Sequence, residues 1–215
     1  MYYLILAVIS IIVIVVAIKS SMLRNVVFNN DNFGMLAETD GKTKPRAAFS
    51  LGRSQLAFWT VIIISSFIYV YLNASPQEYA APVLAVVNLT LLGIAAGTTI
   101  ASKVIDNSQK DTQGTSIPQQ DYPSEGFLID IISDEKGVSI YRLQSVIWTL
   151  IIGAIYIAYV SGKSKMPDDT VITSQLLILM GISSSTYVGL KTTENTSAPV
   201  SPATTNLVPP TGGGK

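Results

Sequence analysis

The side chains that most often perform acid–base or nucleophilic chemistry are missing from this sequence, which contains neither histidine nor cysteine. Their absence excludes imidazole bases, thiol nucleophiles, disulfides and nearly all zinc-site designs. Asp130, Asp134 and Glu135 stand close enough in the sequence to suggest a metal site. A solvated polar face of a short helix explains them better. We therefore predict no metal, no cofactor and no catalytic residue, and we expect a protein that is not an enzyme.

Two arginines stand in matching surroundings, Arg53 three residues after Ser50 and Arg142 three residues after Ser139. Each serine is expected to cap the start of a helix with its hydroxyl group. Each arginine is then expected at the membrane surface, where it anchors the helix and reaches toward phosphate. A sharper interpretation is an interfacial lipid or anion contact, made by the arginine together with the helix N-terminus.

Both serine–arginine pairs belong to an internal repeat. Five residues of one unit recur 89 positions later, and these are Ser50, Arg53, Gln55, Trp59 and Thr60, which match Ser139, Arg142, Gln144, Trp148 and Thr149. Gln55 and Trp59 share one helix face, as do Gln144 and Trp148. We predict that both pairs make interhelical polar contacts, with the tryptophans near the membrane surface.

Small residues recur every fourth position in the second helix of each unit. They are Gly93, Gly97 and Ala101 in the first unit, and Gly181, Ser185 and Gly189 in the second. In lipid, this spacing lets two helix backbones approach closely. The stripes are therefore predicted to be helix-packing or pore-lining. Whether they face the core of their own subunit or a subunit interface stays open.

Membrane-spanning helices must position these residues. Only 13% of the chain is charged, against roughly 25% in soluble domains. Stretches of about 20 apolar residues predict five spans, at about 1–18, 55–72, 80–101, 143–160 and 171–190. A signal peptide is the competing interpretation of the first, but no basic residue precedes Lys19. No acidic residue lies inside a predicted span, which disfavours a proton-driven transporter.

The expected fold is an all-α polytopic membrane protein with an N-terminal transmembrane helix (1–18) and two parallel helical-hairpin repeats (49–103 and 138–191). A polar cytoplasmic segment (19–48) precedes the first hairpin. The linker between them (104–137) should carry a short interfacial helix at about 125–136, capped by Ser124 and ended by Gly137. The tail (192–215) is expected to be disordered and cytoplasmic.

The distribution of basic residues predicts the orientation. With five spans, all but two of the 14 lysines and arginines fall on one side, the exceptions being Lys163 and Lys165. The N-terminus is therefore expected outside and the C-terminus in the cytoplasm. The formal net charge of zero gives no reason to expect a nucleic-acid partner.

The repeated strings FSLGRSQLAFWT with LLGIAAGTT, and GVSIYRLQSVIWT with LMGISSSTYVGLK, resemble a family of bacterial multi-pass membrane proteins that carry SLGRTQMAFW-type and GISxGTxxG-type motifs in this order. The resemblance covers about 49–191. This chain departs from the pattern at Ala95, Ala96 and Ser185. The resemblance implies a bacterial cytoplasmic (inner) membrane, and it implies no biochemical activity.

Two functions are compatible with these features. The first is a non-enzymatic membrane scaffold or anchor subunit that docks partners on its cytoplasmic face, as a homo-oligomer or within a membrane complex. The second is an oligomeric channel lined by the small-residue third and fifth helices. In both cases the lipid bilayer is the first partner expected.

Overall fold

The computed structural model describes residues 1–41, 44–74, 82, 84–109, 121–134 and 137–191. These ranges are mostly helical, which confirms the all-α class. In chain order the elements are α1 (Tyr2–Lys19), α2 (Asn30–Thr39), α3 (Leu51–Asn73), α4 (Val86–Gln109), α5 (Phe127–Ile132), β1 (Ser133–Asp134), β2 (Gly137–Val138), α6 (Ile140–Lys163) and α7 (Ser174–Lys191). The predicted tail, 192–215, and Glu135 lie outside the described residues.

Within the described ranges, four helices are long and apolar enough to cross a membrane: α1, α3, α4 and α6. The fifth predicted span coincides with α7, which has 18 residues but is not among those four. Its polar residues, including Ser174, Gln175 and the run from Ser183 to Thr186, lower its mean hydropathy. The structure therefore supports four spans by length and composition, and not the count of five.

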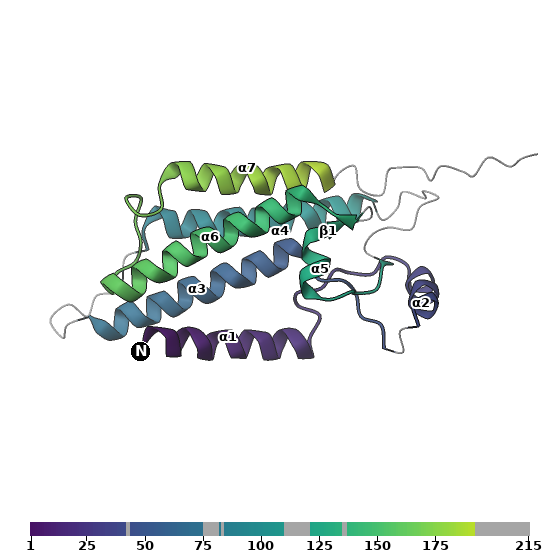
Figure 1. The fold of residues 1–215 in the computed structure, drawn as a ribbon, viewed down its shortest axis with the longest axis horizontal. Coiled ribbons are helices and arrows are strands. Elements are labelled where there is room, and N and C mark those ends of the chain that lie inside the picture. Colours follow the sequence, from purple (N-terminus) through teal and green to yellow (C-terminus); the bar gives the residue numbers. More distant parts are fainter. Residues whose placement is uncertain (42–43, 75–81, 83, 110–120, 135–136, 192–215) are drawn as a thin grey trace, which may run out of the picture.

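The five long helices lie side by side with similar axis directions (Figure 1). α1 packs on α3, α3 packs on α4 and α6, and α7 packs on α4 and α6. Two glycines permit the close approaches of α3. A Cβ atom on Gly52 would lie 3.2 Å from Thr99 Cα on α4, and one on Gly153 of α6 would lie 2.5 Å from Phe58 Cζ. A side chain at Gly153 would therefore require the Phe58 ring of α3 to move.

Large apolar side chains fill the centre of the bundle. Trp59, Leu91, Ile152 and Tyr156 are each completely buried, and Trp59 and Tyr156 meet edge to face with ring centroids 6.4 Å apart. The Tyr156 hydroxyl group donates to Asn88 Oδ1 at 2.6 Å, which pairs the buried amide of α4 with α6. Trp59 is thus a core residue of the bundle and not an outward-facing residue of an aromatic belt.

The described segments between α1 and α3 and between α5 and α6 lie at one end of the bundle, together with α2 and α5 (Figure 1), whereas the connection between α6 and α7 lies at the opposite end. We call the first of these ends, formed by residues 20–41, 44–50, 121–134 and 137–139 with the ends of the adjoining long helices, the α5 end. Asp121, completely buried, holds two segments together there, since its Oδ1 accepts from the Phe28 amide at 2.6 Å and the Asn29 amide at 3.0 Å.

Two local predictions at the α5 end are wrong. The short helix ends at Ile132, not near 136, and Gly137 belongs to β2 of the small hairpin. Ser124 does not cap that helix. Gly126 precedes it, with a φ of 126° that favours glycine. Ser50 and Ser139 do precede α3 and α6, but neither hydroxyl group makes a capping hydrogen bond.

Candidate functional site

The six small residues of the two stripes line a single groove between α4 and α7. The groove has a volume of about 420 Å³ and opens to the outside of the bundle. Its lining comprises Gly93, Ile94, Gly97, Thr98 and Ala101 from α4, with Gly181, Ser184, Ser185, Val188 and Gly189 from α7. The stripes therefore meet each other across an open face, and they do not face the core of the described subunit.

The space above this groove is unfilled by the described residues. A Cβ atom added to Gly93, Gly97, Gly181 or Gly189 would have no heavy atom within 4 Å. These glycines are thus unnecessary for packing inside the subunit, in contrast to Gly153. Their small size leaves room at the surface for another backbone.

Hydroxyl groups in the groove differ in whether they have a partner. Thr98 donates to the Ile94 carbonyl oxygen at 2.7 Å, and Ser185 donates to the Ile182 carbonyl oxygen at 3.0 Å. Because these two hydroxyl groups already bond to carbonyl oxygens of their own helix, they need no hydrogen bond to water. Ser184 is only 4% exposed, and its hydroxyl group has no hydrogen-bond partner. The wall of the groove thus contains one hydroxyl group that is buried without a hydrogen-bond partner.

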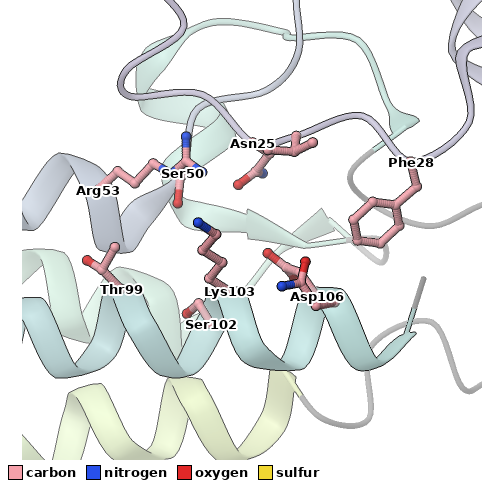
Figure 2. A pocket seen from close by; sticks show the side chains of 10 residues that line it. Asn25, Phe28, Ser50, Arg53, Thr99, Ser102, Lys103 and Asp106 are labelled. Carbon is pink, nitrogen blue, oxygen red and sulfur yellow. The ribbon is translucent and has the colours of Figure 1, made fainter. Parts of the chain in front are cut away.

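A second concavity, of about 60 Å³, lies at the α5 end (Figure 2). Its lining is mixed polar and apolar and comes from three segments: Asn25, Val26 and Phe28 before α2, Ser50 and Arg53 at the start of α3, and Thr99, Ser102, Lys103, Asp106 and Asn107 near the end of α4. Figure 2 shows Lys103 extending its ammonium group from α4 toward Ser50. We call it the Arg53–Lys103 pocket.

Backbone contacts hold Arg53 in place. Its Nη1 donates to the Arg24 carbonyl oxygen at 2.6 Å, and the Ser50 amide donates to the Leu23 carbonyl oxygen at 2.8 Å. These bonds fix the segment before α2 against the start of α3. The close approach of Gly52 to Thr99 then sets the width of the pocket between α3 and α4.

Arg24 is half-buried and lies over the Phe49 ring, with 4.0 Å between its Cζ and the ring centroid. Burial lowers the pKa of the Arg24 guanidinium, the nearby charge of Arg46 lowers it further, and Asp130 opposes both effects. Arginine still keeps its charge at neutral pH. The Arg24 guanidinium is therefore held by the segment before α3, where it donates to the Ala47 carbonyl oxygen and lies over Phe49.

The two arginines predicted to contact lipid or anions have different surroundings. Arg53 is half-buried on the wall of the pocket. Arg142 is 3% exposed, and its Cζ lies 5.0 Å from the centroid of the Tyr187 ring. Arg142 is thus enclosed by protein, so the predicted lipid or anion contact at this residue is wrong in the described subunit.

The repeated glutamines also differ. Gln55 is 4% exposed, and its Nε2 donates to Ser145 Oγ at 2.9 Å and Thr149 Oγ1 at 2.8 Å on α6. Gln144 is exposed, and Trp148 is only partly buried. Trp59 is completely buried, but its indole N–H has no hydrogen-bond partner. Among these four residues, Gln55 is the one that the structure places in an interhelical polar contact.

Asp130, one of the three acidic residues considered as metal ligands, instead accepts hydrogen bonds from neighbouring segments of the chain. This side chain is 8% exposed, so the predicted solvated face is wrong at this position. Its carboxylate accepts from the Phe49 amide at 3.0 Å, the Ser124 hydroxyl group at 2.6 Å and the Glu125 amide at 2.9 Å. Among the described residues, no group of three or more potential ligands is placed to hold a metal ion.

Sequence reasoning missed two features of the bundle. The hydrogen bond between Tyr156 and Asn88 is one. The other is the ion pair between Lys191 Nζ and Asp106 Oδ1, at 3.0 Å. In the sequence, Lys191 is only the last residue of the second predicted hairpin (138–191). Its burial, at 3% exposure, has no signal in the periodicity of the sequence.

Comparisons with known proteins add no relative to this description. No family model matches the chain, and the searches of curated proteins and of solved structures found no significant similarity. The resemblance based on the repeated motifs therefore stays a prediction.

Proposed function

We propose that this chain is a non-enzymatic integral membrane scaffold or anchor subunit that associates laterally through the groove between α4 and α7. The observation that carries the proposal is the open space above Gly93, Gly97, Gly181 and Gly189. Stripes of small residues favour helix association in lipid because they allow backbones to pack closely. The occupant we propose is a transmembrane helix, from a second copy of the chain or from another subunit.

The proposal includes α7 as a fifth span. Its 18 residues extend about 27 Å at the helical rise of 1.5 Å per residue, close to the thickness of the hydrocarbon core. Its polar residues Ser183 and Ser184 are buried by neighbouring helices. A helix shielded in this way needs less apolar surface than a span surrounded by lipid.

The proposal also treats the two hairpins as parallel repeats. α3 packs on α4 as α6 packs on α7, and the matching residues run in the same direction. Basic residues at the α5 end support a cytoplasmic location for that end, with the N-terminus outside. A bacterial inner membrane follows only from the motif resemblance. Partner proteins would then dock on the α5 end, the largest part of the described chain outside the long helices.

An oligomeric channel is the second candidate, because α4 and α7 present their small residues on one face. A water-filled pore favours polar groups that need hydration. The hydroxyl groups of Thr98 and Ser185 bond to their own helix carbonyls, and most of the groove lining is apolar. These features favour a contact with protein over a water-lined path.

Small-to-large substitutions test the proposed association. Gly97→Leu and Gly181→Leu should leave the fold intact, because their side chains would enter open space, but should block an incoming helix. Gly162→Leu is the matched control, since Gly162 is a helical glycine with equally open surroundings on α6. In mild detergent and in lipid nanodiscs, the mass of the protein assembly should fall for the two groove variants only. A monomeric wild-type chain without a stoichiometric partner would contradict the proposal.

Ion-flux measurements separate the two candidates. The wild-type chain reconstituted in liposomes should give no conductance above that of empty vesicles. A conductance that Gly97→Leu abolishes and Gly162→Leu preserves would favour the channel instead.

A further inference from the structure

The Arg53–Lys103 pocket contains two cationic side chains on opposing helices. Arg53 begins α3 and Lys103 lies near the end of α4, and both line the same concavity of about 60 Å³. One water molecule needs about 10–15 Å³ by the same measure. The concavity is therefore large enough for several waters or for one tetrahedral oxyanion.

The charge balance of the pocket is positive. Asp106 is its acidic lining residue, and Lys191 from α7 approaches that carboxylate to 3.0 Å. With Asp106 neutralised in this way, the charges of Arg53 and Lys103 stay uncompensated by the other lining residues. Of the five N–H donors of a guanidinium, Arg53 commits one to the Arg24 carbonyl oxygen. The Ser50 hydroxyl group, which makes no capping bond, faces the same space.

The corresponding positions of the second hairpin form a closed version of this pocket. Thr99 corresponds to Tyr187, and Lys103 corresponds to Lys191, each 88 positions later. There the Tyr187 ring lies against the Arg142 guanidinium, and Lys191 is buried in its ion pair with Asp106. The protein thus fills one of the two sites with its own side chains. In the first hairpin, the smaller Thr99 leaves the space open between two cations.

We propose that the Arg53–Lys103 pocket binds a phosphate group, with Arg53 and Lys103 pairing with its oxygens and the Ser50 hydroxyl group donating to them. Arginine and lysine are the side chains that recognise phosphate most strongly. The first-turn amides of α3 also favour an anion at this point. The phosphate comes from an anionic lipid headgroup or from a free phosphate in solution. This inference does not depend on what occupies the groove between α4 and α7.

Lipid retention by the full-length chain tests the proposal. Native mass spectrometry in mild detergent would compare phosphatidylglycerol with phosphatidylcholine of the same acyl chains. Lys103→Gln removes one cation from an exposed position and should lower the affinity for phosphatidylglycerol about tenfold, the effect of losing one charge-assisted hydrogen bond. Thr99→Tyr should do the same by placing a ring where the second hairpin has Tyr187.

Lys19→Gln is the matched control, because Lys19 is an exposed lysine at the end of α1 near the same end of the bundle. It should leave retention unchanged. Addition of inorganic phosphate, against chloride of equal ionic strength, distinguishes the two sources. A free phosphate is identified if inorganic phosphate displaces the lipid and raises the melting temperature of the wild-type protein but not that of Lys103→Gln. A lipid headgroup is identified if phosphatidylglycerol stays bound in the presence of inorganic phosphate.

Two results would overturn the proposal. One is binding of neither phosphatidylglycerol nor inorganic phosphate by the wild-type chain. The other is an equal loss of binding in Lys19→Gln and Lys103→Gln, which would mean that nonspecific charge at the membrane surface accounts for retention. Because Lys103→Gln changes an exposed side chain, the test does not depend on whether Thr99→Tyr folds.

Discussion

The ammonium group of Lys191 lies 3.0 Å from the carboxylate of Asp106, where α7 ends beside α4. Lys191 is 3% exposed and Asp106 is 18% exposed. The pair therefore ties the two helices that form the groove and also neutralises the acidic wall of the Arg53–Lys103 pocket. This ion pair thus lies between the α4–α7 groove and the Arg53–Lys103 pocket.

The first prediction concerns this ion pair. Asp106→Asn removes the carboxylate that lies 3.0 Å from the buried ammonium group of Lys191. We expect a loss of roughly 1–3 kcal/mol in the free energy of unfolding, less than for a fully buried pair because Asp106 is partly exposed. Thermal unfolding in detergent measures the loss. Lys191→Met in the same chain should recover much of it, and a double variant no more stable than Asp106→Asn would contradict this account of the contact.

The second prediction compares Gln55, which is buried, with Gln144, which is exposed. Gln55→Met removes hydrogen bonds to Ser145 and Thr149 inside the bundle, so it should destabilise the protein by about 0.5–1.5 kcal/mol, the usual range for polar contacts between membrane helices. Gln144→Met changes the corresponding exposed residue and should have almost no effect. Equal unfolding temperatures for the two variants would show that the α3–α6 contact is not as described.

The third prediction concerns Asp130, whose carboxylate joins the start of α5 to the segment before α3. Asp130→Ala removes the acceptor for two backbone amides and the Ser124 hydroxyl group. We expect faster proteolytic cleavage within 121–132, because local opening of this segment becomes easier. Asp31→Ala, an exposed acidic residue on α2, provides the comparison. Its cleavage pattern should match wild type, and an unchanged pattern in Asp130→Ala would show that the carboxylate does not hold α5 in place.

The fourth prediction concerns the buried hydrogen bond between Tyr156 and Asn88. Tyr156→Phe keeps the ring in the core but leaves the Asn88 carbonyl oxygen without that donor. An unsatisfied buried acceptor costs about 1–3 kcal/mol. Tyr159→Phe on the same helix, where the side chain is only partly buried, should cost much less. The difference between their unfolding temperatures in detergent measures the contribution of the bond.

The sequence predicted the long helices well because apolar content and length are local properties. It placed α3 and α6 to within four residues at each end. The fifth span, at α7, was predicted because it repeats the third, and not from its apolar content, which is too low for length and composition to support a span. The stripes of Gly93 and Gly181 were recognised by spacing, but spacing alone did not say whether they faced the core or the outside.

What the sequence did not predict depends on which neighbour covers each residue. Gln55 and Gln144 are equivalent by position, yet Gln55 meets the hydroxyl group of Ser145, whose own counterpart in the first hairpin is the apolar Leu56. Arg142 is enclosed because Tyr187 stands where the first hairpin has Thr99. When the residue that contacts a repeated residue differs between the two hairpins, the repeated residue has a different environment in each. The repeat pattern contains only the residues that the two hairpins share, so it does not predict these differences.

Site-directed photo-crosslinking is the most direct test of lateral association through the α4–α7 groove. Because the chain has no cysteine, Gly97→Cys introduces a single thiol that a benzophenone maleimide can label in native membranes. Gly162→Cys is the control on α6. Our account predicts crosslinks from position 97 to a protein, either a second copy or another subunit, and not from position 162. Crosslinks from position 97 to lipid alone would contradict it.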